Sequence, residues 1–251
     1  MKIFLRHLSQ VYYLLFYRVC SSFYYRVLEG KIMFLNIEKL SFSYGHHEVI
    51  KDLSLNLNIG DILAIQGPSG SGKTTLFKLI SGLETPQSGV IHIDSNCVVS
   101  IDGHCIRPEK RQVGFIFQDY ALFPHMTVFQ NIAFGCFKMP KPLLKPYVMS
   151  LLKEIELEAY KDAYPHTLSG GQMQRVAIAR ALASRPKVLL MDEPFSNLDE
   201  SLKDVLIPSL KTLFNKHQLT VIIATHHQRD IDLLASKVLH LENGSLVDKK
   251  G

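Results

Sequence analysis

Hydrophobic and polar residues alternate along two stretches of the chain, residues 33–45 and residues 47–60. Alternation with a period of two is typical of β-strands that bury one face. The first stretch therefore predicts a strand that ends at Gly45, and the second predicts a pair of strands that closes at Gly60. Residues 83–93 predict a turn followed by another strand. Four shorter runs are apolar, as in strands buried on both faces: 62–65, 113–118, 188–191 and 221–224.

Segments with helical periodicity lie between these runs. We expect one helix to begin at Thr74 and two others to span residues 172–183 and 201–216. Strands that alternate with helices imply a mostly parallel sheet in a three-layer arrangement. The pattern therefore predicts an α/β protein.

Residues 119–165 differ from the rest of the chain. They contain no strong β-type run, and prolines cluster between residues 124 and 146. Residues 149–160 (MSLLKEIELEAY) have the pattern of an amphipathic helix. We expect a helical subdomain, inserted at about residues 119–165.

The composition of the chain bears on its domain size and on the use of its cysteines. A chain of 251 residues with 47% hydrophobic residues is large enough for one α/β domain with a subdomain, and too apolar to be disordered. The four cysteines are scattered and lack a paired metal-ligand spacing. A disulfide framework is therefore not expected, and a reducing compartment fits.

The net charge of +5 comes mainly from the first 32 residues, which carry a net charge of +4. The remaining residues include 23 basic and 22 acidic side chains, so this part of the chain is nearly neutral. A nucleic-acid-binding protein would have a basic surface, and we therefore expect no nucleic-acid partner.

Residues 1–32 also hold eight of the chain's 24 aromatic residues. Their apolar stretch is interrupted by Arg18, so it is too broken for a membrane-spanning helix and makes a poor signal peptide. Two interpretations stay open. The segment is an interfacial membrane anchor, or translation begins at Met33 and the segment is absent from the functional protein. In both cases residues 33–251 form the main domain.

The sequence GPSGSGKT, residues 67–74, joins an apolar run to the start of a helical pattern, as a phosphate-binding loop does. Glycines permit positive φ, so several backbone N–H groups can point into one concavity, and the helix adds its own free N–H groups. Lys73 supplies a charge for the β- and γ-phosphates, and the Thr74 hydroxyl is a ligand for Mg²⁺. The expected nucleotide-binding residues here are Gly67, Pro68, Ser69, Gly70, Ser71, Gly72, Lys73, Thr74 and Thr75.

Two further motifs follow. In LSGGQMQ, residues 168–174, Ser169 suits the N-cap of the helix that comes next. In VLLMDEP, residues 188–194, an apolar strand presents Asp192 and Glu193 at its carboxyl end, where open α/β sheets bind ligands.

With these three motifs in this order, the sequence resembles the ATP-binding cassette (ABC) ATPases, the ATP-hydrolysing subunits of membrane transporters, over about residues 33–245. The resemblance implies a P-loop NTPase core with a mostly parallel sheet. It also implies an N-terminal antiparallel β subdomain and a helical insertion carrying the signature motif. The implied activity is hydrolysis of ATP, with ATP and Mg²⁺ bound.

The resemblance implies roles for single residues at the site of hydrolysis. Asp192 helps to hold Mg²⁺, and Glu193 positions or deprotonates the attacking water, because phosphoryl transfer separates charge neutralisation from orientation of the water. Gln118 touches Mg²⁺ and the water, and transmits movement to the helical insertion. His226 is the switch histidine that contacts the γ-phosphate; its neighbour His227 departs from the more usual acid.

Other residues are implied to act at the nucleotide's periphery. Tyr44 stacks on adenine, and Asp199 ends the loop SNLD (196–199), which runs along a dimer interface. The signature binds the γ-phosphate of ATP held by the opposite subunit. Its residues are Ser169, Gly170, Gly171 and Gln172.

The implied assembly is a homodimer with two composite sites, peripheral on the cytoplasmic face of the cell membrane. Its implied partners are integral-membrane permease subunits and a substrate-binding protein. Residues 107–135 are similar to importer subunits, and the strand-like stretch 98–106 favours the ferric-iron branch of these. The alternatives are a non-transport ATPase and the ATPase of an export or lipoprotein-release complex.

The helical insertion is expected to dock the permease. Tyr120, Leu122 and Phe123, just after Gln118, are candidate contacts. The other interpretation is that these three side chains pack within the insertion.

Overall fold

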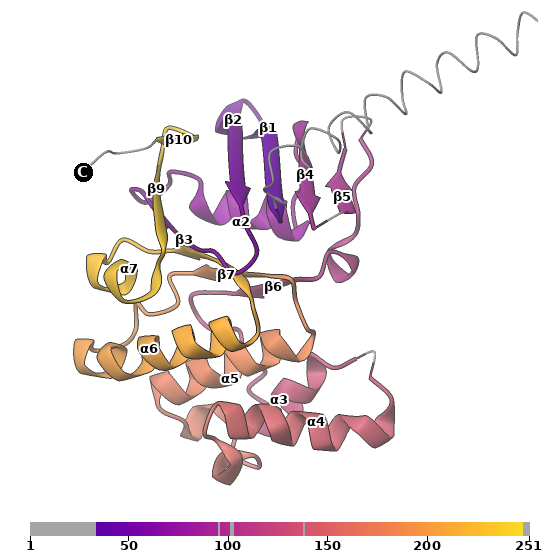
Figure 1. Cartoon of the computed structure of the whole chain (residues 1–251), viewed down its shortest axis with the longest axis vertical. Coiled ribbons are helices and arrows are strands. Elements are labelled where there is room, and N and C mark those ends of the chain that lie inside the picture. Colours follow the sequence, from indigo (N-terminus) through magenta and orange to yellow (C-terminus); the bar gives the residue numbers. More distant parts are fainter. Residues whose placement is uncertain (1–33, 95, 101–102, 138, 248–251) are drawn as a thin grey trace, which may run out of the picture.

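The computed structural model describes residues 34–94, 96–100, 103–137 and 139–247. The two interpretations of residues 1–32 lie outside this part of the chain. Two β-sheets and several helices form stacked layers (Figure 1). Among the helices that the structure describes, none combines the length and hydrophobicity needed to span a membrane.

The smaller sheet is antiparallel and has the strand order β2-β1-β4-β5. Its strands are β1 (Leu35–Tyr44), β2 (His47–Leu57), β4 (Ser88–Ile93) and β5 (Asn96–Val99). β2 is one strand, where the pattern predicted a pair. Asp52 has a φ of 43°, and the buried positions change phase there, from Ile50 to Leu53. This bulge interrupts the alternation and explains the wrong prediction.

The larger sheet has the order β10-β9-β3-β8-β7-β6. Its strands are β3 (Ile62–Gln66), β6 (Val113–Ile116), β7 (Val188–Asp192), β8 (Thr220–Ala224), β9 (Lys237–Glu242) and β10 (Ser245–Val247). Every neighbouring pair is parallel except β9 with β10. The prediction of an α/β fold with a mostly parallel sheet is therefore confirmed. The carboxyl ends of the parallel strands meet at one edge, where the glycine-rich loop, Gln118 and the Asp192–Glu193 pair lie.

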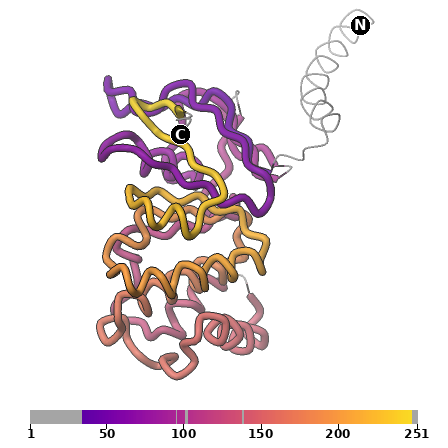
Figure 2. The backbone as a smooth tube through the Cα atoms, turned by 60° about the vertical axis from the view of Figure 1, so that its left-hand side comes forward, coloured from indigo at the N-terminus to yellow at the C-terminus, as the bar shows by residue number. Residues whose placement is uncertain are grey.

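Four helices pack on the larger sheet: α2 (Lys73–Ser81), α5 (Gly170–Ala183), α6 (Glu200–Lys216) and α7 (Gln228–Leu234). Leu63 and Ile65 of β3 share one core with α2 and the antiparallel sheet. Ile62 and Ala64 of the same strand share the other core with α5 and α6. The helix that follows the glycine-rich loop is thus held between the two sheets (Figures 1 and 2). Burial on both faces explains why these strands are apolar throughout.

Residues 119–165 lie at the end of the molecule opposite the antiparallel sheet (Figure 2). The described part of this segment holds α3 (Val128–Phe134), α4 (Lys141–Glu154) and short 3₁₀ turns, and no strand. α4 begins earlier and ends earlier than the predicted helix at 149–160. Pro142 is tolerated in the first turn of α4, because the N–H that it lacks has no partner within a helix.

Candidate active site

A cavity of about 400 Å³ lies at the carboxyl ends of β3, β6 and β7. Three segments that are far apart in the sequence contribute to it, since the parallel strands end at the same edge of the sheet: the glycine-rich loop after β3, Gln118 after β6, and Asp192 with Glu193 at the end of β7. Nine predicted site residues line it: Ser69, Gly70, Gly72, Lys73, Thr74, Thr75, Gln118, Asp192 and Glu193.

The loop between β3 and α2 has a conformation that requires glycine. Gly70 and Gly72 have φ values of 79° and 105°, which side chains other than glycine rarely adopt. A Cβ atom on Gly67 would lie 2.4 Å from the Leu241 carbonyl oxygen. Gly72 precedes the first residue of α2 and offers no side-chain cap. The N–H groups at the start of α2 therefore remain open to an anion.

Lys73 is held over this loop. Its side chain is 8% exposed, and Nζ donates to the carbonyl oxygens of Gly67 (2.8 Å) and Pro68 (3.0 Å). Both partners are neutral carbonyl groups, so the ammonium charge is available to a phosphate. Because the ammonium group has three N–H donors, it can keep contacts to the loop while it binds an anion.

Thr74 and Asp192 form the second part of the site. The Thr74 hydroxyl donates to Asp192 Oδ2 over 2.6 Å. Burial is the main cause that raises the pKa of Asp192, and the nearby Glu193 raises it further, while Thr74, Lys73 and Lys78 oppose this rise. A carboxylate that is partly desolvated in this way gains from a cation at the same place.

These oxygen atoms fit Mg²⁺. Magnesium takes hard oxygen ligands and is usually bound by one or two carboxylates together with the phosphates of a substrate. The Thr74 hydroxyl, the Asp192 carboxylate and the Gln118 side chain supply such donors around one cavity. In the described part of the chain no three His, Cys, Asp or Glu side chains are grouped to hold a metal alone.

Glu193 has an unusual backbone. Its φ is 44°, and its N–H donates to the Ala224 carbonyl over 2.9 Å, which links the end of β7 to the end of β8. Its side-chain Oε1 lies 3.3 Å from Nδ1 of His226. The ring of His227 packs on that of His226, with centroids 4.1 Å apart. Of the two adjacent histidines, His226 is thus the one that contacts the carboxylate.

The signature residues lie elsewhere. Ser169 caps α5: its hydroxyl accepts from the Gln172 N–H (3.3 Å), and its own N–H donates to Gln172 Oε1 (2.9 Å). Asp199 caps α6 by accepting from the Leu202 N–H over 2.8 Å. This bond is the largest cause that lowers the pKa of Asp199.

The two helix starts are neighbours. Cβ atoms added to Gly170 and Gly171 would lie 3.2 Å from Leu198 Cδ2 and 2.9 Å from Leu202 Cδ2 respectively. The signature residues and Asp199 are all described by the structure, and none of them lines the cavity. Within one chain they form a separate face.

Tyr44 also lies outside the set that lines the cavity. Its side chain is 45% exposed at the end of β1, its hydroxyl donates to Glu84 over 3.2 Å, and its ring meets Phe42 edge to face. Sequence reasoning missed His47 and Val49, which line the cavity from β2. The available signal was the hairpin, since His47 pairs with Tyr44 across its turn.

Comparisons with known proteins agree with this geometry. The family model described as ABC transporter matches residues 50–196. The chain is 42% identical over 217 residues to the "Probable sulfate/thiosulfate import ATP-binding protein CysA" of Chlorella vulgaris, covering 86% of this chain and 90% of that protein. It is 42% identical over 214 residues to the spermidine/putrescine import ATP-binding protein PotA of Aggregatibacter actinomycetemcomitans. That match covers 84% of this chain but 56% of PotA, so the chain spans little more than half of that relative.

A solved structure gives the same result for the fold. The structure of cbiO1 from Clostridium perfringens, described as part of the ABC transporter complex cbiONQ, is similar with a TM-score of 0.77 and 32% identity. The match covers 87% of this chain and 88% of that one. The chain therefore belongs to the ABC transporter family, as an ATP-hydrolysing subunit of the importer type.

Proposed function

We propose that two copies of this chain close on two molecules of Mg²⁺-ATP and drive solute import through separate membrane subunits. Each ATP would lie between the cavity of one copy and the signature residues of the other. The proposal rests on one observation: the two sets of expected phosphate-binding residues lie apart within one chain. In one chain, the phosphate-binding loop lines a cavity that the signature residues do not reach.

The face formed by the signature residues has the chemistry of a phosphate site. The first turn of α5 offers backbone N–H groups and the positive end of the helix dipole. The Ser169 hydroxyl is exposed beside them. A two-fold dimer brings two such faces against two cavities and generates identical sites.

The residues of the cavity divide the work of hydrolysis. Lys73 and the loop N–H groups hold the phosphates, and Glu193 accepts a proton from the attacking water or orients it. Gln118 lines the same cavity after the neighbouring strand β6. His226 fixes the Glu193 carboxylate. Thr74, Asp192 and Gln118 would hold Mg²⁺, which supplies charge neutralisation on the phosphates when bound. Tyr44, exposed at the edge of the site, would stack on adenine.

The loop after Gln118 links the cavity to α5. Arg180 of α5 donates to the carbonyl oxygens of Ala121 (2.7 Å) and Tyr120 (2.8 Å). α5 begins with the signature, so movement at Gln118 and movement at the partner's nucleotide would be coupled through one rigid helix. This is the mechanical link that the proposed transport cycle requires.

One candidate contact for the permease is not on the surface. Tyr120 is 4% exposed and packs in the core, which contradicts its choice as a docking residue. Leu122 packs against the same core, so the interpretation as internal packing applies to it too. Phe123 is half-buried, and its ring lies under Arg180.

A groove of about 480 Å³ is the better dock for the membrane subunit. It lies between α3, α4 and the end of α5, and its lining includes Phe137 and Leu143. These side chains are 66% and 59% exposed. Exposed apolar residues around a groove are typical of protein contact sites, and a short helix of the permease is the occupant that we propose.

The solute that we propose is a small ion, inorganic or organic. The two relatives quoted above are named for sulfate or thiosulfate, which are anions, and for polyamines, which are cations at neutral pH. These solutes are all small ions, although the sign of the charge differs. The preference for ferric iron stays a prediction. The chain would work on the cytoplasmic face of the membrane, with a substrate-binding protein acting through the permease.

Mixing two inactive variants tests the composite site. Lys73→Ala removes phosphate binding in the loop, and Ser169→Glu places a negative charge where the partner's γ-phosphate would lie. A mixed dimer has one site with both defects and one site with neither. We therefore expect the mixture to hydrolyse ATP faster than the sum of the two separate variants, measured by phosphate release.

The control is a mixture of Lys73→Ala with Thr75→Glu. Both changes lie in the same loop, so no mixed dimer contains an intact site, and no recovery is expected. If Lys73→Ala with Ser169→Glu also gives no recovery while the two chains form mixed dimers, the composite site is wrong.

A further inference from the structure

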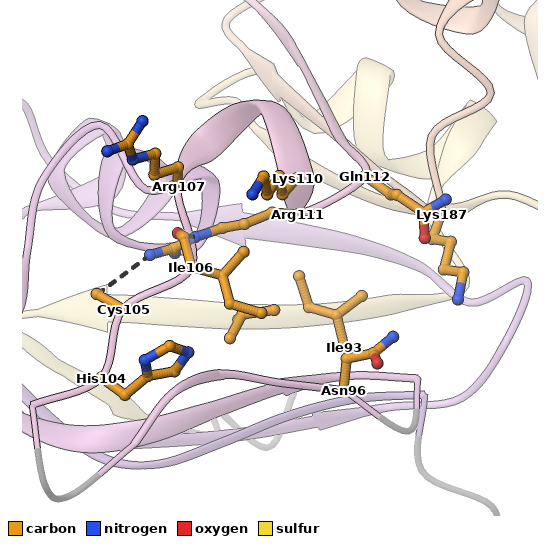
Figure 3. Close-up of a pocket in the computed structure, with 11 residues that line it drawn as sticks. Ile93, Asn96, His104, Cys105, Ile106, Arg107, Lys110, Arg111, Gln112 and Lys187 are labelled. Atoms are coloured by element: carbon orange, nitrogen blue, oxygen red, sulfur yellow. Dashed lines mark hydrogen bonds between the residues drawn. The ribbon is translucent and has the colours of Figure 1, made fainter.

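A second cavity, of about 440 Å³, lies at the opposite ends of β6 and β7 from the nucleotide cavity. It is lined by Gln112 and Lys187, which directly precede these two strands (Figure 3). The nucleotide cavity is instead lined by Gln118 and Asp192 at their far ends. The two cavities share no lining residue.

The wall of this cavity is cationic. Arg107, Lys110, Arg111 and Lys187 line it, and no carboxylate of the described residues does so. Lys187 is paired with Asp94 over 2.6 Å. Arg107 and Lys110 are exposed and have no ion-pair partner in the described part of the chain. The other three cations, Arg107, Lys110 and Arg111, repel one another, so an anion between them would be stabilising.

Arg111 is the fixed part of this wall. It is 3% exposed. Its Nε donates to the Ile106 carbonyl (2.7 Å) and its Nη1 donates to the carbonyls of Leu79 (2.8 Å) and Ile80 (3.0 Å), near the end of α2. Its Nη2 donates to Cys105 Sγ over 3.3 Å, the bond drawn in Figure 3. A guanidinium group carries five N–H donors, so one N–H of Nη2 is left without a partner among the described residues.

No carboxylate of the described residues pairs with Arg111. Burial is the main cause that lowers the pKa of this guanidinium, and its contact with Cys105 opposes that effect. A buried guanidinium that is fixed by neutral groups is oriented in advance for an anion. Less side-chain entropy is lost when such a group binds a ligand.

The floor of the cavity is apolar. It consists of Ile93, Val98 and Ile106, and the first two are 1% and 2% exposed. β5 and the isolated bridge between Val99 and Cys105 hold this floor in place. A cationic rim above an apolar floor suits a ligand with an anionic group and an apolar body, and the volume lies in the range of small-molecule sites.

We propose that this cavity binds a small organic phosphate. The phosphate group lies against Arg107, Lys110 and the free N–H of Arg111, and the apolar body covers the half-buried Ile106. This site is separate from the one that binds ATP. It does not depend on the function proposed above.

Phenyl phosphate is a direct probe, because it joins a phosphate to an apolar ring. We would titrate it calorimetrically into the full chain with the nucleotide cavity filled by Mg²⁺ and a non-hydrolysable ATP analogue. We expect saturable one-to-one binding with a Kd of about 1 mM or tighter. Arg107→Gln/Lys110→Gln should weaken it at least about tenfold, a loss of roughly 1.4 kcal/mol.

The matched control is Lys141→Gln/Lys145→Gln, which removes the same charge from exposed positions of α4 away from this cavity. It should bind phenyl phosphate as the wild type does. All four changes lie at exposed positions, and unchanged thermal midpoints would show that folding is intact. The single variant Arg107→Gln gives a second test, with an intermediate loss of affinity expected.

Two further probes separate the parts of the ligand. Inorganic phosphate should bind more weakly than phenyl phosphate, because it lacks the ring that covers the floor, and neutral benzyl alcohol should not bind. If inorganic phosphate bound as tightly as phenyl phosphate, the proposal that the ligand has an apolar body would be wrong. The whole proposal is overturned by an absence of saturable binding, by unchanged binding in the Arg107→Gln/Lys110→Gln variant, or by an equal loss in the α4 control.

Discussion

Glu193 is fixed from three directions: its N–H bonds to Ala224, its carbonyl oxygen accepts from the Ser196 hydroxyl (2.9 Å), and its carboxylate contacts His226. We expect Glu193→Gln to bind ATP normally, because Asp192 and Lys73 are unchanged. Its kcat should fall about 10²- to 10⁴-fold, the usual effect of removing a general base. Single-turnover hydrolysis beside nucleotide binding separates the two effects. Glu158→Gln, at an exposed position, is the control, and hydrolysis near the wild-type rate in Glu193→Gln would contradict the role of this carboxylate.

The Asp192 carboxylate, a proposed ligand of Mg²⁺, is expected to lower the stability of the nucleotide-free fold at neutral pH. Burial raises its pKa in the folded chain above the unfolded value, so between the two pKa values the folded chain binds more protons and stability falls as pH rises. The nucleotide-free Asp192→Asn variant should therefore be more stable than the wild type at neutral pH. The difference should vanish towards pH of about 4, near the ordinary pKa of an aspartate. Thermal midpoints measured across this pH range test it, and a difference independent of pH would contradict it.

Lys203 and Asp230 form a buried ion pair close to Thr225, the residue that follows β8. Their side chains are 2% and 1% exposed and lie 3.3 Å apart, and Asp230 accepts a hydrogen bond from Thr225 over 3.0 Å. Asp230→Asn leaves the buried Lys203 ammonium with one carboxylate partner, the exposed Glu200 at 3.2 Å. It should lower the free energy of unfolding by about 1–3 kcal/mol, because a buried charged group then loses one of its two partners. Urea denaturation measures this. Asp204→Asn, which breaks the exposed pair with Arg229, should leave the midpoint unchanged, and equal effects of the two changes would refute the importance of burial.

At the scale of elements, changes in the groove beside α4 are expected to abolish transport without abolishing ATP hydrolysis. Phe137→Glu with Leu143→Glu places charge on its apolar wall, far from the nucleotide cavity. Basal ATP hydrolysis should stay within about twofold of the wild type, since surface changes of this kind cost little stability. Transport in reconstituted vesicles should be lost. Lys145→Glu, an exposed charge change on the same helix, serves as the control. Undiminished transport by the double variant would exclude this groove as the dock.

The elements that the sequence predicted correctly have a simple physical origin. β3, β6, β7 and β8 are buried on both faces, so their apolar runs are unbroken and their polar ends mark the edge of the sheet. α3 and α7 have seven residues each, which is too short for a helical period to stand out. The bulge at Asp52 and the early start of α4 depend on tertiary packing, which local patterns do not contain.

In the candidate site too, local sequence patterns predict some features, and others depend on tertiary packing. Motifs at strand ends converge because parallel strands share an edge, so Lys73, Asp192 and Gln118 could be predicted to meet. The contact between Glu193 and His226 depends on β7 lying beside β8, which the sequence order alone does not state. The position of His47 at the cavity, and the burial of Tyr120, depend on how the subdomains pack.

At the scale of the whole molecule, the phosphate-binding loop and the signature residues lie on separate faces of one chain. In the proposed assembly a solitary chain would lack a complete site for hydrolysis, and a second copy related by a two-fold axis would complete it. ATP, rather than a large permanent interface, would supply the contacts that hold the copies together. Opening after hydrolysis would then return the membrane subunits to their first state.

In the proposed dimer, ATP joins two copies through the phosphate-binding loop of one and the signature residues of the other. Sedimentation equilibrium of the Glu193→Gln variant tests this most directly, because it gives the mass of the particle with Mg²⁺ and ATP or with Mg²⁺ and ADP. We expect twice the mass of one chain with ATP and the mass of one chain with ADP. Adding Ser169→Glu, which places a negative charge against the partner's γ-phosphate, should abolish the dimer. The same mass with both nucleotides, or a dimer that survives Ser169→Glu, would show that ATP does not join the copies in this way.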